Sequence, residues 1–152
     1  MNAAATEPSR LYPARPILAA SVAVFRDGRV LLAARANPPG EALFSLPGGV
    51  VEAGETLEQA ALRELREEVQ VEARIIGFNT HVEVIDRDGE DLLRRHFVVA
   101  SFVAIWRSGE PQVGPEALAV IWVDPGKLGG IALTRGLAPV LRSAQRILER
   151  AA

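Results

Sequence analysis

Apolar residues in the first third of the chain occur in short β-prone runs that are separated by turn signals. Ile17–Phe25 and Val30–Ala34 are two such runs, and the residues between them include Asp27-Gly28. Because an Asp-Gly pair favours the tight turn of a hairpin, this stretch predicts a β-hairpin. Phe44–Leu46 predicts a further short strand, which Pro47-Gly48-Gly49 should end.

The spacing of apolar residues changes to that of an amphipathic helix over Leu57–Val69. Strong helix formers fill this stretch, and Thr56 precedes it as a candidate N-cap. At 100° per residue, Leu62, Leu65 and Val69 fall within about 60° of one another. We therefore expect these three side chains to face the core.

The second half of the chain returns to strand-like patterns before a terminal helix. Ile75–Ile85 and Arg94–Trp106 are long β-prone stretches joined by a turn at Asp88-Gly89, and Val120–Val123 is a further short strand. Apolar residues at helical spacing then predict a last helix that Thr134 caps. This element order favours an α/β sandwich in which helices cover a mixed sheet.

Length and composition fit a single domain. The chain has 152 residues, of which 49% are hydrophobic, enough to bury one sizeable core. Residues 1–15 are rich in alanine and proline with little periodicity, so we expect a flexible N-terminal tail followed by one domain over residues 16–152.

Charge and cysteine content narrow the function classes. The formal net charge of −2 and the lack of a dense Lys/Arg run argue against nonspecific binding to nucleic acid or membranes, and a small or phosphorylated ligand fits better. Without cysteine, a metal site must use oxygen or imidazole ligands. The N-terminus lacks the pattern of a signal peptide, and no apolar run approaches 18 residues. We expect a cytoplasmic protein.

The predicted central helix carries an acidic face. Glu64, Glu67 and Glu68 fall within an arc of about 100° that is separate from the apolar face. Like charges at these spacings destabilise an isolated helix by about 0.2 to 0.5 kcal/mol per pair, which a hard divalent cation would offset. Mg²⁺ prefers oxygen ligands from a few carboxylates and from substrate phosphates. A carbonyl of the Gly48-Gly49 loop is a plausible further ligand, because glycine permits close approach.

Such a site points to metal-assisted hydrolysis of a diphosphate. A further carboxylate would be useful as the base for the attacking water or as another ligand, and Glu116 is our candidate. Arg35 leaves a predicted strand beside a Pro/Gly loop and is a candidate contact for a substrate phosphate. Glu52 is a second candidate substrate contact, and both residues also fit ordinary surface positions.

The acidic residues belong to a longer pattern with fixed offsets. Gly49 to Glu68 reads Gly-x5-Glu-x7-Arg-Glu-Leu-x-Glu-Glu, and residues 49–71 resemble the Nudix box. The resemblance implies a Nudix-type α/β/α sandwich and ligation of Mg²⁺ or Mn²⁺ by Glu64, Glu67 and Glu68 with the carbonyl of Gly48. An acidic residue outside the box often assists in this family, and Glu116 occupies a similar loop.

The remaining positions of the box predict structural roles, and one of them departs from the motif. Gly49 and Arg63 are expected to be structural, with Arg63 bracing carboxylates or backbone; Glu55 is either structural or an outer metal or water-positioning group. Gln70 departs from the box, which has glycine there. Glycine would supply a left-handed turn at the helix end, which glutamine adopts at a cost of about 1 kcal/mol. We expect an altered loop after Val69 with metal binding intact.

The resemblance implies an enzyme that cleaves a diphosphate linkage in a nucleoside diphosphate joined to another moiety, with ADP-ribose or a related sugar as the first candidate. Two alternatives remain: a nucleoside triphosphate pyrophosphohydrolase that cleans the nucleotide pool, and a nucleotide-sensing module without catalysis. All three glutamates are present, which favours the enzyme. Similar proteins suggest a homodimer.

Overall fold

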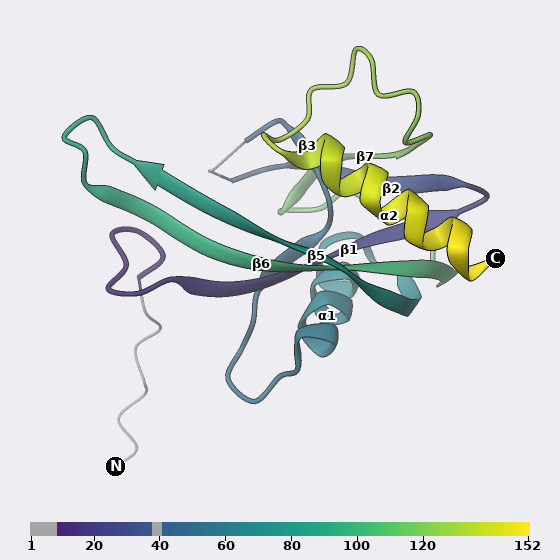
Figure 1. The fold of residues 1–152 in the computed structure, drawn as a ribbon, viewed down its shortest axis with the longest axis horizontal. Coiled ribbons are helices and arrows are strands. Elements are labelled where there is room, and N and C mark those ends of the chain that lie inside the picture. Colours follow the sequence, from purple (N-terminus) through teal and green to yellow (C-terminus); the bar gives the residue numbers. More distant parts are fainter. Residues whose placement is uncertain (1–8, 38–40) are drawn as a thin grey trace.

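The computed structural model describes residues 9–37 and 41–152 (Figure 1). Its elements in chain order are β1 (Ile17–Arg26), β2 (Arg29–Arg35), β3 (Phe44–Ser45), β4 (Gly48–Val50), α1 (Leu57–Val69), β5 (Glu72–Arg87), β6 (Leu93–Ser108), β7 (Ala117–Val123) and α2 (Leu137–Ala151). The predicted hairpin, the short strand at Phe44 and the bounds of the central helix are confirmed.

Within the described residues, seven strands form one mixed sheet. The main path is β3-β2-β1-β6-β5, with β4 paired to β1 and β7 paired to β2. β1 and β6 run parallel, whereas the other pairs are antiparallel. The predicted α/β architecture with a mixed sheet is therefore confirmed.

The two helices cover opposite faces of this sheet. Successive residues of a strand point to opposite faces, so neighbours in β1 belong to different halves of the core. Val22 packs in the cluster that contains Leu65 and Val69 of α1, and Ala23 packs in the cluster that contains Leu141 of α2. Leu65 and Leu141 are fully buried, and each contributes about 1.5 to 3 kcal/mol of burial energy.

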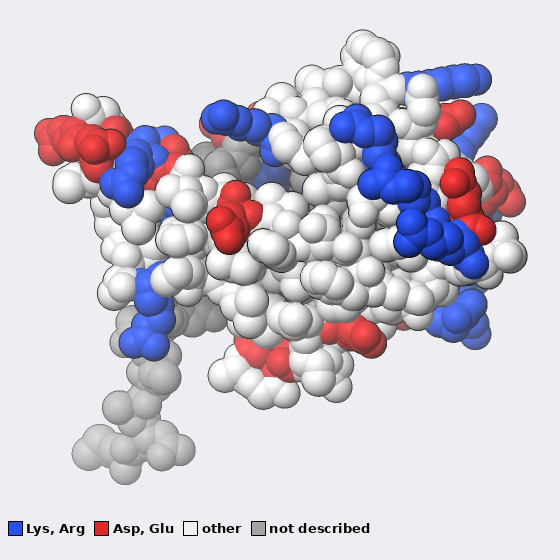
Figure 2. All heavy atoms as spheres, viewed as in Figure 1, with Lys and Arg blue, Asp and Glu red and all other residues white. Residues whose placement is uncertain are grey.

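α2 combines this buried face with a basic outer face. Arg142, Arg146 and Arg150 recur every fourth residue and are exposed. Figure 2 shows the corresponding band of positive side chains along α2. No helix in the described part of the chain is long and apolar enough to cross a membrane.

β5 and β6 form a long hairpin whose far end extends beyond the helices as an arm (Figure 1). They pair from Glu72 opposite Ser108 to Arg87 opposite Leu93. At the tip, the Asp88 carboxylate accepts hydrogen bonds from the backbone N–H groups of Glu90 and Leu92, at 2.9 and 3.0 Å. The turn predicted at Asp88-Gly89 is confirmed.

The N-terminal segment reaches this arm. Residues 1–8 of the expected tail lie outside the described residues. Tyr12 donates its backbone N–H to the Arg94 carbonyl at 2.8 Å and its hydroxyl to Asp88 Oδ2 at 2.8 Å. The boundary between tail and domain stays a prediction.

Two local predictions were wrong. Thr134 does not cap α2: Gly136 does, at φ 82°, while Thr134 donates its hydroxyl to Ser45 Oγ at 3.2 Å and its N–H to the Phe44 carbonyl. The contact with β3 thus competes with capping. Pro47-Gly48-Gly49 does not end the local β structure, because Gly48 and Gly49 pair with β1 in strand β4. A Cβ at position 48 would lie 2.4 Å from the Ala20 carbonyl oxygen, so only glycine allows this pairing.

The end of α1 keeps its left-handed turn without glycine. Gln70 has φ 61° and ψ 37°, and its N–H donates to the Arg66 carbonyl at 3.0 Å. Gln70 thus adopts the turn that the box glycine would supply, and the altered loop expected after Val69 stays a prediction. The strain costs about 1 kcal/mol relative to glycine.

Candidate active site

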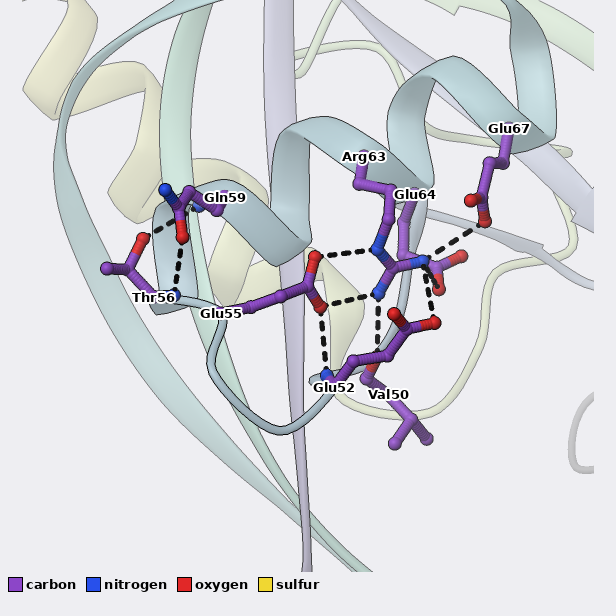
Figure 3. A network of polar contacts seen from close by, with 8 residues as sticks. All are labelled: Val50, Glu52, Glu55, Thr56, Gln59, Arg63, Glu64 and Glu67. Atoms are coloured by element: carbon purple, nitrogen blue, oxygen red, sulfur yellow. Dashed lines mark hydrogen bonds and ion pairs between the residues drawn. The ribbon is translucent and has the colours of Figure 1, made fainter. Parts of the chain in front are cut away.

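The first turn of α1 is fixed by a capping box. The Thr56 hydroxyl accepts from the Gln59 N–H at 3.1 Å, and the Gln59 side chain accepts from the Thr56 N–H at 2.9 Å (Figure 3). These two bonds satisfy N–H groups that a helix start leaves unpaired. The capping box fixes where α1 begins, and the start of the helix sets which way its acidic face points.

Arg63 is the centre of a polar network that joins α1 to the preceding loop (Figure 3). Its guanidinium binds both carboxylate oxygens of Glu55, at 2.7 and 2.8 Å. It also donates to Glu64 at 2.9 Å, to Glu67 at 3.1 Å and to the carbonyl of Val50 at 3.1 Å. The planar fork of arginine suits such multiple contacts, so Arg63 braces carboxylates and backbone together.

The network fixes the loop from β4 to α1. Glu55 also accepts the Glu52 N–H at 2.9 Å, which closes the turn. The Arg63 guanidinium beside Glu55 lowers the pKa of that carboxyl to about 2, and the same pairing raises the pKa of Arg63. Glu52 is 65% exposed and lies 3.8 Å from Arg63. Glu55 is thus held by Arg63 and by the Glu52 backbone, and the choice between a structural role and an outer metal or water-positioning role stays open.

Glu64 lies against the backbone of Gly49. A Cβ at position 49 would be 2.5 to 2.7 Å from the atoms of the Glu64 carboxylate, so any other residue would displace that group. Burial raises the pKa of Glu64, although Arg63 partly opposes the shift. The glycine of the motif thus has a physical role in making room for a carboxylate.

Glu68 is a partly buried acid on the same side of α1. Its Oε1 accepts the Gly48 N–H at 3.4 Å. Burial raises the pKa of Glu68 to about 8, while the Gly48 N–H and the positive charge of Arg35 lower it. A carboxylate held in such a place is costly when it is charged, and a cation bound beside it would remove that cost.

Three carboxylates converge here from distant parts of the chain. Glu64, Glu68 and Glu116 each offer an oxygen, and these oxygens lie within 4.8 Å of one another. A group of hard oxygen donors with two partly buried members, Glu64 and Glu68, fits a divalent cation of the Mg²⁺ type. Glu67, the third expected ligand of α1, is 56% exposed and is bound to Arg63 instead of joining this trio.

The trio lies at the side of a large cavity. The cavity has a volume of about 830 Å³ and is lined by both acidic and apolar residues, including Glu68, Glu116, Val82, Phe97 and Leu137. Mixed walls of this kind are typical of sites for small organic ligands with a charged part. Val82 of β5, Phe97 of β6 and Leu137 of α2 contribute to the apolar wall, whereas the acidic groups come from α1, the loop before it and the loop before β7.

The other candidate substrate contacts also line this cavity. Arg35 and Glu52 are both among the lining residues, as are Arg10 and Arg135, which the sequence patterns did not single out. Sequence reasoning also missed Ser101, which is fully buried yet lines the cavity. The only signal for it was a lone hydroxyl within an apolar strand.

Known proteins agree with this fold and motif. The NUDIX domain family model matches residues 15–144. An ADP-ribose pyrophosphatase of Methanocaldococcus jannaschii is 32% identical over 123 residues, which is 81% of this chain and 70% of the relative. A MutT NUDIX hydrolase from Burkholderia pseudomallei has a TM-score of 0.74 at 30% identity, over 85% of this chain and 98% of that chain. The NUDIX domain of Shewanella oneidensis NrtR, solved in complex with ADP ribose, has a TM-score of 0.71 at 25% identity, over 88% and 89%. The motif, the fold and these relatives show that the chain belongs to the Nudix family of hydrolases.

Proposed function

We propose that this hydrolase cleaves the diphosphate linkage of ADP-ribose or a related nucleoside diphosphate sugar with the help of Mg²⁺. One observation carries the proposal: the carboxylates of Glu64, Glu68 and Glu116 converge beside a cavity with apolar walls. A diphosphate needs charge neutralisation, and the organic groups on either side of it need a large cavity. Similarity to an ADP-ribose pyrophosphatase supports the choice of substrate.

The metal ligands in this proposal are Glu64 and Glu68 with the carbonyl of Gly48, joined by Glu67, which is bound to Arg63 in the structure. Arg63 holds Glu64 and Glu67 on one side of α1, at 2.9 and 3.1 Å. Gly48 holds Glu68 through its N–H. When bound, Mg²⁺ supplies charge neutralisation for the diphosphate and lowers the pKa of a bound water.

Glu116 is the proposed general base, although it can also serve as a ligand. Glu64 and Glu68 already accept hydrogen bonds, from Arg63 and Gly48 respectively. Glu116 is exposed, and its carboxylate oxygen lies within 4.8 Å of oxygens of Glu64 and Glu68, close enough to the proposed ligands to take a proton from the attacking water. A water oxygen then bonds to phosphorus, the bond from that phosphorus to the bridging oxygen breaks, and Glu116 takes the proton.

Substrate contacts in this proposal come from the cavity wall. Arg35 binds a phosphate oxygen, and Glu52 contacts a polar group of the substrate near the loop before α1. Both residues line the cavity. An Arg35→Ala variant should raise KM more than it lowers kcat, because a phosphate contact present before and during the reaction contributes uniform binding.

The first experiment is product analysis with ADP-ribose, other nucleoside diphosphate sugars and nucleoside triphosphates, with Mg²⁺, with Mn²⁺ and with chelator. We expect cleavage of ADP-ribose to two phosphomonoesters only when metal is present. Glu64→Gln, Glu67→Gln and Glu68→Gln should each lower kcat by orders of magnitude with the fold retained, whereas Glu149→Gln on the far side of α2 serves as a matched control. Preference for triphosphates would replace the substrate class, and binding without turnover would overturn hydrolysis of this substrate.

A homodimer is part of the same proposal and rests only on the family resemblance. Light scattering coupled to gel filtration measures the mass of the particle in solution. A mass near 16.3 kDa would contradict the dimer.

A further inference from the structure

Two serine hydroxyls lie next to each other in the lining of the cavity. Ser21 of β1 and Ser101 of β6 are opposite each other in the parallel register, and their Oγ atoms are 3.1 Å apart, within hydrogen-bonding distance. Ser101 is fully buried, and it is the one buried polar or charged residue in the described part of the chain. Ser21 is partly exposed, and both residues line the cavity.

Hydrogen-bond counting shows which hydroxyl is available to a ligand. Each serine has one hydroxyl hydrogen, and either hydroxyl can donate, so one bond between them leaves one hydrogen over. If Ser101 kept that hydrogen, it would be buried without an acceptor among the described residues, which is unfavourable. In the structure Ser21 donates to Ser101 Oγ. Because both hydroxyls rotate, the pair can reverse when a ligand offers Ser21 an acceptor, so that Ser101 donates to Ser21. The hydrogen of Ser21 can then turn toward the cavity.

The position of Ser21 connects the apolar part of the cavity to the acidic residues. Ser21 is also opposite Gly48 in the pairing of β1 with β4. A Cβ at Gly48 would lie 2.8 Å from the Ser21 Cβ, so the serine side chain packs directly over the glycine. The N–H of this same Gly48 binds Glu68. Ser21 therefore packs against the glycine that binds Glu68, and all three residues line the same cavity.

We propose that Ser21 donates a hydrogen bond to an oxygen of the substrate's diphosphate group, and that Ser101 positions the Ser21 hydroxyl. The inference rests on the proposed function, since it assumes a diphosphate beside Glu68. Ser21 is the residue that touches substrate. Ser101 acts only through Ser21, because its own side chain is shielded from the cavity solvent.

The kinetic test compares Ser21→Ala, Ser101→Ala and the double variant, with ADP-ribose and Mg²⁺. Loss of a hydrogen bond to a charged phosphate oxygen should lower kcat/KM of Ser21→Ala by about 10- to 100-fold. Ser101→Ala should have a smaller effect, about threefold, and no further effect when Ser21 is already alanine. Ser108→Ala, an exposed change at the far end of β6, is the matched control and should leave kcat/KM unchanged.

Thermal unfolding separates this role from a merely structural one. Ser21→Ala leaves the Ser101 hydroxyl buried without its partner and should lower Tm by a few degrees. The double variant removes both polar groups and should recover most of that Tm. Its kcat/KM should nevertheless stay as low as that of Ser21→Ala. If kcat/KM instead recovers together with Tm, Ser21 supports only the fold and the inference is wrong.

The outcomes also distinguish this inference from the proposed function. If wild type cleaves ADP-ribose and Ser21→Ala has the same kcat/KM, the role of Ser21 is wrong and the proposed function is unaffected. Wild type that binds ADP-ribose without cleaving it overturns the function, and calorimetric Kd values of wild type and Ser21→Ala then decide the inference. Wild type that neither binds nor cleaves ADP-ribose overturns both.

Discussion

The partly buried carboxylate of Glu68 makes the metal-free protein sensitive to pH. Its pKa in the folded protein is raised to about 8 from an ordinary value of 4.5. As pH rises from about 4.5, the unfolded chain loses this proton first, so the folded state becomes less stable until pH passes about 8. Glu68→Gln keeps a similar shape and an acceptor for the Gly48 N–H but carries no charge. It should therefore stabilise the metal-free protein at neutral and alkaline pH.

The structure sets the size of this effect. The pKa of Glu68 differs by about 3.5 units between the unfolded value of 4.5 and the folded value of about 8. At about 1.4 kcal/mol per unit, the stability that the variant gains over wild type above pH 8 is at most about 5 kcal/mol. The negative charges of Glu64 and Glu116 contribute to the raised pKa of Glu68, and the site relaxes around a charge, so we expect about 2 to 4 kcal/mol. At pH 5 the difference between wild type and variant should be below about 1 kcal/mol, since Glu68 is then mostly protonated in the folded state.

Urea unfolding at pH 5, 7 and 9, with chelator and with saturating MgCl₂, measures the effect. With chelator, the variant should gain stability over wild type as pH rises. With Mg²⁺ at about 100 times its Kd, wild type should gain about 2.7 kcal/mol, whereas the variant should gain much less. A constant difference between the two proteins from pH 5 to pH 9 with chelator would refute the reasoning about Glu68.

Three further substitutions test the frame of the site. Gly49→Ala places a Cβ 2.5 Å from the Glu64 carboxylate, so it should cost about 1 to 3 kcal/mol of stability and lower kcat at least tenfold. Urea unfolding measures the stability and initial rates measure kcat. Wild-type values of both would contradict the close contact. Arg63→Lys loses the two-point contact with Glu55, so steady-state kinetics should show a kcat about 10- to 100-fold lower. Arg66→Lys, an exposed change on the same helix, is the control. Gln70→Gly should raise the free energy of unfolding by about 1 kcal/mol with kcat unchanged, because position 70 has φ 61°; a lower urea midpoint would count against strain there.

Local interactions explain what the sequence predicted well. The bounds of α1 follow from a cap, strong helix formers and apolar residues at helical spacing, all of which act within a few residues. The convergence of glutamates on one side of α1 follows from the same geometry. Arg63 could be assigned a bracing role from the sequence, since Glu67 lies one turn away on the helix.

Nonlocal contacts explain where the patterns failed. Thr134 has the side chain of a helix cap, but β3 binds its hydroxyl and N–H, so the start of α2 depends on a segment about 90 residues away in the chain. Gly48 looked like a strand breaker, but its missing side chain is what lets β4 pair with β1. In both cases a tertiary partner outweighed a local preference.

The sequence by itself determined the family motif, the helix that presents the acidic residues and the chemistry that those residues favour. Only the tertiary structure decided which carboxylates meet: Glu116 joins Glu64 and Glu68, while Glu67 is held by Arg63. The same holds for the pairing of Ser21 with Ser101. Periodicity places a side chain on a face of its own element, but the distance between two elements depends on how the whole sheet pairs and packs.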